Sequence, residues 1–149
     1  MRLYYYDTYQ HLTGPLTSGA LLPSESNLKP TDDPPNPQVV WLSTEQDPST
    51  GGWVLPIGEG ERPEVRVTVN VPDEWVRVWD DWAYDEGIDP DWKKDVIKMG
   101  GGPSSVARWR VVLRPVPIKM WESIEDVSSG HPYDIRHARY RALMGQRGL

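Results

Sequence analysis

The stretch Val65-Arg66-Val67-Thr68-Val69-Asn70-Val71 decides the fold class, because valine alternates with polar residues along its whole length. Successive side chains of a strand point to opposite faces of a sheet, so this period of two predicts a strand with one buried face. Valine is also among the residues that strands favour most. We therefore expect a central strand at residues 65–71.

Three other segments are predicted to form central strands with it. Residues 3–6 read Leu-Tyr-Tyr-Tyr, residues 39–43 read Val-Val-Trp-Leu-Ser, and residues 108–114 alternate apolar with largely basic side chains. Aromatic and β-branched residues favour strands, and turn residues bound each run. A further short strand is expected at residues 53–55, Trp-Val-Leu.

Helical segments are predicted between the strands. Thr8 is a suitable N-cap and Gly19 a suitable end for a short first helix. Pro72 opens a second helix, which Gly87 ends. Its apolar face consists of Trp75, Val78, Trp79 and Trp82, spaced as one stripe of a helix. Further helical segments are expected at residues 89–99, 118–124 and 132–145, and a proline-rich surface loop at residues 23–38.

Strands interleaved with short helices predict a single α+β domain. A chain of 149 residues favours one domain, which at this length buries about 70% of the surface of its unfolded chain. We assign residues 1–130 to this domain and residues 131–149 to a basic C-terminal helical tail.

The composition excludes several classes of protein. There is no cysteine, so disulfides, thiolate nucleophiles and Cys-ligated zinc are excluded. The three histidines stand at positions 11, 131 and 137, without the spacing of a zinc site, so no metal is expected. No run approaches the roughly 18 apolar residues of a membrane-spanning helix, and the first residues lack a signal-like apolar core. We expect a cytoplasmic protein without a membrane partner.

Charge is segregated along the chain, whose formal net charge is −6. Residues 73–95 carry nine acidic and three basic residues, whereas residues 131–149 carry four arginines and one aspartate. An acidic body argues against nonspecific binding of nucleic acid by the whole surface. The acidic segment is a candidate contact surface for a basic protein partner, although a solvated helix face is the simpler interpretation.

Several short motifs follow one another along the chain. They are Leu-Tyr-Tyr-Tyr-Asp at residues 3–7, Gly-Ala-Leu at residues 19–21, Val-Trp-Leu-Ser at residues 40–43, Trp-Arg-Val at residues 109–111 and Pro-Val-Pro at residues 115–117. Their order resembles the ADP-ribosyltransferase superfamily, whose small bacterial and phage members have a first strand L-Y-H-Y-T at the place of residues 3–7. A helix ending in G-x-L follows at residues 19–21, then V-W-L-S at residues 40–43, and W-x-V at residues 109–111 leading into P-V-P at residues 115–117. The resemblance covers about residues 1–121 and implies a split β-sheet with short peripheral helices.

The resemblance also implies a chemistry, in which NAD is a substrate and the bond between nicotinamide and ribose breaks through an oxocarbenium-like state. The first-strand histidine of the family falls on Tyr5, and the second motif supplies Ser43. The family's last-strand acid falls near Ala107 or Arg108, where this chain has no acid, so Glu122 is the candidate substitute. The implied catalytic residues are therefore Tyr5, Ser43 and Glu122.

The residues implied to bind NAD are Tyr5, Tyr6, Trp41, Ser43, Arg66 and Arg108. Of these, Tyr5, Trp41 and Ser43 are expected to line one cleft, with loop 23–38 at its border. Arginines on strands that face such a cleft suit a pyrophosphate, because a guanidinium donates two parallel hydrogen bonds. In the alternative interpretation the aromatic residues belong to the core and the arginines face solvent.

Two functions follow from these observations. The first is an NAD-dependent ADP-ribosyltransferase-like protein, of the phage or toxin-effector type, that modifies a protein or nucleic-acid acceptor. The second is a noncatalytic binding or inhibitor module on the same scaffold, which uses the acidic surface at residues 73–95.

Overall fold

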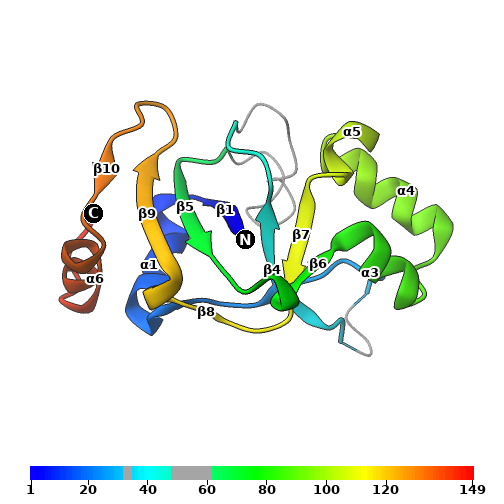
Figure 1. Cartoon of the computed structure of the whole chain (residues 1–149), viewed down its shortest axis with the longest axis horizontal. Coiled ribbons are helices and arrows are strands. Elements are labelled where there is room, and N and C mark those ends of the chain that lie inside the picture. Colours follow the sequence, from blue (N-terminus) through cyan, green and yellow to red (C-terminus); the bar gives the residue numbers. More distant parts are fainter. Residues whose placement is uncertain (32–34, 48–61) are drawn as a thin grey trace.

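The computed structural model describes residues 1–31, 35–47 and 62–149. They form one small α+β domain built on an eight-stranded antiparallel sheet (Figure 1). The sheet contains β1 (Arg2–Asp7), β3 (Ser24–Glu25), β4 (Gln38–Ser43), β5 (Val65–Asn70), β6 (Val76–Val78), β7 (Trp109–Val112), β9 (Trp121–Asp126) and β10 (Pro132–Tyr133). Its order is β10-β9-β5-β1-β4-β7-β6, with β3 also on β4. The expected α+β class and four central strands are confirmed.

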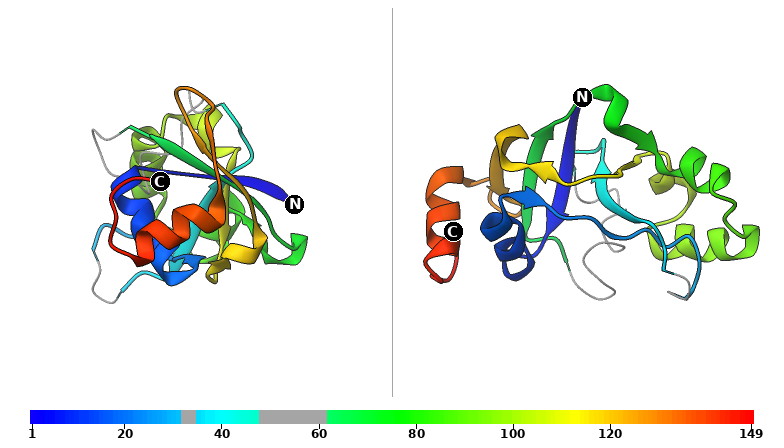
Figure 2. Two further views of the ribbon diagram at one scale, coloured as in Figure 1. Left: turned by 90° about the vertical axis from the view of Figure 1, so that its left-hand side faces the viewer. Right: turned by 90° about the horizontal axis from the view of Figure 1, so that it is seen from below.

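Short helices and a small second sheet complete the described fold. The helices are α1 (Tyr9–Ser18), α3 (Trp79–Asp85), α4 (Pro90–Met99), α5 (Pro103–Val106) and α6 (Ile135–Leu143), and β2 (Ala20–Leu21) pairs with β8 (Val116–Pro117). Figures 1 and 2 show α6 at one end of the molecule and α3, α4 and α5 at the other. None of the helices in the described ranges is long and apolar enough to cross a membrane.

Two hydrophobic cores lie on opposite faces of the sheet. The valines of β5 at positions 65, 67 and 69 are fully buried in the first core, which α1 and α6 cover. Strand β4 serves both cores, because Val40 and Leu42 point into the first and Val39 and Trp41 into the second. The helices α3, α4 and α5 cover the second core. Because α6 covers the first core, residues 131–149 contribute a helix that packs on the domain.

The sheet is continuous but narrows to a seam between β1 and β4. Strand β1 pairs with β5 at six positions, from Arg2 opposite Asn70 to Asp7 opposite Val65. With β4 it has a register of one pair, in which Tyr4 lies opposite Ser43. On the far side of the seam β4 pairs with β7 at four positions. The first core crosses the seam, because Val40, Leu42 and Val112 beyond it belong to the same core as the valines of β5, whereas the second core lies on the β4 and β7 side.

Tryptophans hold the loop after β3 through their indole N–H groups. Trp41 donates to the carbonyl of Glu25 at 2.7 Å, and Trp92 donates to the carbonyl of Asn27 at 2.9 Å. Trp79 lies 3.4 Å from the carbonyl of Ser26 between them. A buried indole usually finds a hydrogen-bond partner, and phenylalanine has no such donor. Phenylalanine at any of these three positions would leave the corresponding carbonyl without its indole donor.

The ends of the first helix confirm the sequence prediction. Thr8 is the N-cap of α1, and its side chain accepts from the backbone N–H of His11 at 3.2 Å. Gly19 caps the other end with φ 79°, a left-handed conformation that costs glycine little. Likewise, Asp89 caps α4 by accepting from two backbone N–H groups.

The helix predicted to follow Pro72 is wrong in its first half. Residues 73–75 form a 3₁₀ turn, residues 76–78 form the edge strand β6, and only residues 79–85 form the helix α3. The Val76-Arg77-Val78 alternation pairs with β7, and that pairing outweighs the helical spacing. Trp79 and Trp82 are buried as expected, whereas Trp75 is half-buried and packs on the first core instead.

The helical segment predicted at residues 118–124 is also wrong. A 3₁₀ turn spans Ile118–Met120, and the strand β9 begins at Trp121. β9 pairs with β5 at five positions between Trp121 and Asp126, with one register shift between Thr68 and Val69, so tertiary pairing again decides the conformation. The loop predicted at residues 23–38 contains the two-residue strand β3. The strand expected at residues 53–55 lies outside the described residues.

Candidate functional site

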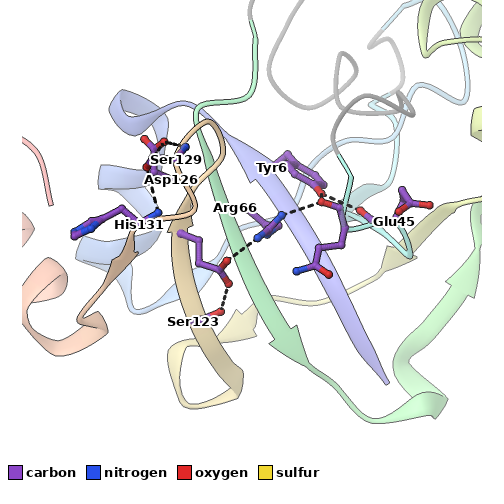
Figure 3. Close-up of polar contacts among 9 residues, drawn as sticks. Tyr6, Glu45, Arg66, Ser123, Asp126, Ser129 and His131 are labelled. Carbon is purple, nitrogen blue, oxygen red and sulfur yellow. Dashed lines mark hydrogen bonds and ion pairs between the residues drawn. The ribbon is translucent and has the colours of Figure 1, made fainter.

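The strands β9, β5 and β1 present a row of polar side chains on the face opposite the first core. The register places Tyr4 opposite Thr68 and Tyr6 opposite Arg66. It places Glu125 on the other side of Arg66. Figure 3 shows the resulting network from Tyr6 through Arg66 to Ser123. We call the side chains of Tyr4, Tyr6, Arg66, Ser123 and Glu125 the Arg66 network.

Arg66 lies at the centre of this network and is 9% exposed. Its Nη2 lies 2.6 Å from Oε2 of Glu125, and its Nη1 donates to the carbonyl of Gln46 at 2.8 Å. Its guanidinium also lies over the Tyr4 ring, 5.9 Å from the centroid. Its Nε is buried without a hydrogen-bond partner in the described part of the chain. An unsatisfied buried donor of this kind is uncommon in folded proteins.

The segment after β4 gathers four of the residues implied to bind NAD. The hydroxyl of Tyr6 lies 2.7 Å from the carbonyl oxygen of Gln46 and 2.9 Å from that of Glu45. Oγ of Ser43 accepts from the N–H of Glu45 at 3.0 Å, and Nε of Arg108 lies 3.4 Å from the Glu45 carboxylate. Together with Arg66, these side chains fix residues 43–46 above the polar face.

Burial and hydrogen bonding set the charge of the network. Burial raises the pKa of Tyr6 to about 12, so its hydroxyl stays neutral and donates at physiological pH. Burial raises the pKa of Glu125, but hydrogen bonds from Ser123 and Arg66 outweigh it, and the net pKa lies below the usual value. Glu125 is therefore an ionised carboxylate beside a guanidinium.

Tyr5 lies on the opposite face of the sheet from Ser43 and Trp41. It packs on the first core, and its hydroxyl donates to Asp7. Trp41 is 4% exposed and belongs to the second core. The cleft expected from Tyr5, Trp41 and Ser43 is therefore not formed, because Tyr4, and not Tyr5, is the residue opposite Ser43.

Glu122 lies apart from the Arg66 network, near the start of β1. Its two carboxylate oxygens bind Arg2, at 3.0 Å from Nη2 and 3.3 Å from Nε. The carboxylate beside Arg66 is that of Glu125, which the sequence analysis missed. The alternation of Ser123 and Glu125 around the buried Ile124 was an available signal. The three-residue spacing of Ile118, Trp121 and Ile124 obscured it.

A second polar group closes the turn between β9 and β10, and Figure 3 shows it beside the network. Oδ1 of Asp126 accepts from the hydroxyl of Ser128 at 2.7 Å and from the N–H of Ser129 at 2.9 Å. Tyr9 donates to the other oxygen, and these hydrogen bonds hold the pKa of Asp126 well below its usual range. Oγ of Ser129 in turn accepts from the backbone N–H of His131 at 3.1 Å. The group stabilises the turn through bonds typical of Asx turns.

Within the described ranges, no three side chains of the metal-binding types come together as a site. No protein-family model, curated protein or solved structure matches the chain. The Arg66 network and the sequence motifs are therefore the features that bear on function.

Proposed function

We propose that the protein binds NAD at the Arg66 network and is an ADP-ribosyltransferase-like protein that acts on a protein or nucleic-acid acceptor. The observation that carries the proposal is the buried Arg66 guanidinium, whose Nε has no partner in the described part of the chain. A guanidinium binds phosphate oxygens strongly, and a partly desolvated one more so.

Other residues of the network fit the remaining parts of a dinucleotide. The ring of Tyr4 lies half-buried next to Arg66 and offers a surface for a planar ring. Ser43 and Tyr6 both carry hydroxyls that contact residues 45–46, the segment that Arg66 also contacts. The seam between β1 and β4 supports the split sheet that the resemblance implies.

Glu125 replaces Glu122 as the acid proposed to act in this site. Cleavage of the bond between nicotinamide and ribose develops positive charge on the sugar, and a nearby ionised carboxylate stabilises such charge. The lowered pKa of Glu125 keeps this carboxylate ionised at neutral pH. Its ion pair with Arg66 offsets part of that effect, so we expect slow turnover.

Calorimetric titration with NAD, together with an assay of nicotinamide release, tests this proposal. Arg66→Lys retains the charge but removes the guanidinium fork, and should weaken NAD binding by about tenfold or more. Arg136→Lys, on the exposed side of α6, is the matched control and should bind normally. Glu125→Gln should keep NAD binding and lose nicotinamide release.

The proposal fails if the wild-type protein does not bind NAD at millimolar concentration. It also fails if Arg66→Lys binds NAD as well as the wild type does. Circular dichroism of each variant shows that the fold is intact, so that a loss of binding is assigned to the site.

A specific observation favours the noncatalytic alternative. Tyr84 is 78% exposed on α3, next to the acidic residues of segment 73–95. An exposed aromatic side chain within a charged surface is typical of a contact with a protein partner. In this proposal the acidic segment binds a basic partner. If NAD does not bind, capture of a basic protein by the wild type but not by Tyr84→Ala supports it.

A further inference from the structure

A surface pocket of about 460 Å³ lies at the end of the sheet, away from the Arg66 network. Its lining residues are Glu74, Trp75, Arg77, Leu113 and Arg114. They come from the 3₁₀ turn before β6, from β6 itself and from the residues after β7. Since β6 is the last strand of the sheet, the pocket opens at a sheet edge. Its volume lies within the range of small-molecule sites.

The lining of the pocket includes an arginine that lies over a tryptophan ring. The guanidinium of Arg114 lies over the ring of Trp75, with Cζ 4.3 Å from the ring centroid. Trp75 is half-buried against the first core, which fixes its ring. Arg114 itself is exposed, so the flat face that its guanidinium turns away from Trp75 is open to a planar ligand. Nucleobases stack on guanidinium planes of this kind.

A second cation lies on the same pocket. Nη2 of Arg77 lies 3.4 Å from Oδ2 of Asp85, and the side chains of Arg77 and Asp85 are 45% and 63% exposed. An exposed ion pair of this length contributes little free energy, so Arg77 can exchange Asp85 for another anion at small cost. Two guanidiniums on one small pocket favour a ligand with a phosphate group.

The other two lining residues narrow the ligand class. Leu113 is 48% exposed and gives the pocket an apolar side. Glu74 adds a carboxylate to the lining that holds the two arginines. This carboxylate accepts hydrogen bonds from hydroxyls, and it repels a ligand that carries several anionic groups. The combination matches a single phosphate, a sugar with hydroxyls and a flat ring.

We propose that this pocket binds a nucleoside monophosphate. Arg77 and Arg114 bind the phosphate, the base stacks on the open face of Arg114 beside Leu113, and Glu74 accepts from the sugar hydroxyls. The same chemistry occurs in a free nucleotide and in the 5′-phosphorylated end of a nucleic acid. This proposal is independent of NAD binding at the Arg66 network.

The test is a titration with AMP in which binding is measured by calorimetry and by the NMR signal of the Trp75 indole N–H. AMP should bind and shift that signal, whereas adenosine and inorganic phosphate should each bind more weakly. Arg77→Gln and Arg114→Gln should each weaken AMP binding by about fivefold or more. Both side chains are exposed, so these variants should fold, and Arg136→Gln is the matched control.

Arg66→Lys separates this pocket from the Arg66 network, because AMP binding at the pocket should be unchanged in that variant. The proposal is overturned if AMP does not bind at millimolar concentration, or if phosphate alone binds as tightly as AMP. It is also overturned if binding is lost in Arg66→Lys and retained in Arg114→Gln. A 5′-phosphorylated oligonucleotide that binds more tightly than AMP identifies a nucleic-acid end as the ligand. The reverse order identifies a free nucleotide.

Discussion

Gly100→Ala should destabilise the protein, although the backbone at Gly100 suits any residue. Gly100 ends α4 with φ −89° and ψ 12°, so no left-handed conformation requires glycine. At such a position alanine ordinarily stabilises a protein by about 0.4–1 kcal/mol, because it restricts the unfolded chain. Here a Cβ would lie only 2.2 Å from Cζ2 and 2.4 Å from Cη2 of Trp109.

The size of the effect follows from the surroundings of Trp109. Its ring is 1% exposed and lies edge-to-face against Trp79 at 5.1 Å and against Trp41 at 5.9 Å between centroids. The ring cannot move away without disturbing this cluster. Overpacking of a well-filled core costs about 1–3 kcal/mol, and we expect the upper end of that range. The net loss of unfolding free energy should be about 2–3 kcal/mol.

Urea unfolding followed by circular dichroism measures this difference. Met99→Ala, at the neighbouring exposed position, is the control and should change the unfolding free energy by no more than about 1 kcal/mol. Trp109→Phe removes the part of the ring that the new methyl group meets. The double variant Gly100→Ala/Trp109→Phe should therefore be more stable than the sum of the single effects predicts. A neutral or stabilising Gly100→Ala would refute the packing of α4 on Trp109.

Three further predictions concern stability. Trp79→Ala should lower the unfolding free energy by about 3–5 kcal/mol, since the side chain is fully buried, and a loss under about 1 kcal/mol would contradict that burial. Trp92→Phe keeps a ring but removes the hydrogen bond to the carbonyl of Asn27, and should cost about 1 kcal/mol in the same assay; an unchanged midpoint would show that the bond contributes nothing. Because the folded-state pKa of Asp126 lies below its unfolded value, its contribution is present near neutral pH and is lost as the pH falls below about 4. Asp126→Asn should therefore lose less stability than the wild type between pH 7 and pH 3, and parallel losses would argue against this role.

Local signals in the sequence were sufficient for the elements with a strong pattern. The valine alternation at residues 65–71, the helix ends Thr8 and Gly19, and the helical segment expected at residues 89–99 lie where the structure has β5, α1 and α4. Each of these signals acts over a few residues, and no distant contact opposes it. The predicted class and the central strands followed from them.

Predictions failed where a distant partner decides the conformation. Residues 76–78 have helical spacing with their neighbours, but β7 offers them a strand edge. Residues 121–126 pair with β5 in the same way. A single sequence does not show which strand lies beside which, so the hydrogen bonds gained by pairing were not part of the prediction.

The candidate site was predicted in part for the same reason. The pattern of β5 placed Arg66 on the face opposite its valines. Tyr6 lies opposite Arg66, and Ser43 contacts the same segment, residues 45–46, that Arg66 contacts. The choice of Tyr5 required the register between β1 and β4, which a one-residue shift reverses. Glu125 required a strand that the sequence analysis read as a helical segment.

The seam between β1 and β4 joins the two parts of the sheet through side chains more than through backbone pairing. The register across it is the one pair of Tyr4 and Ser43, whereas the first core continues past it from the valines of β5 to Val40, Leu42 and Val112. Opening the sheet along this line would therefore expose part of the first core and leave the second core packed. Arg66 lies on one side of the seam and Ser43 on the other. A ligand held by both residues would oppose this opening and so raise the stability of the whole protein by mass action.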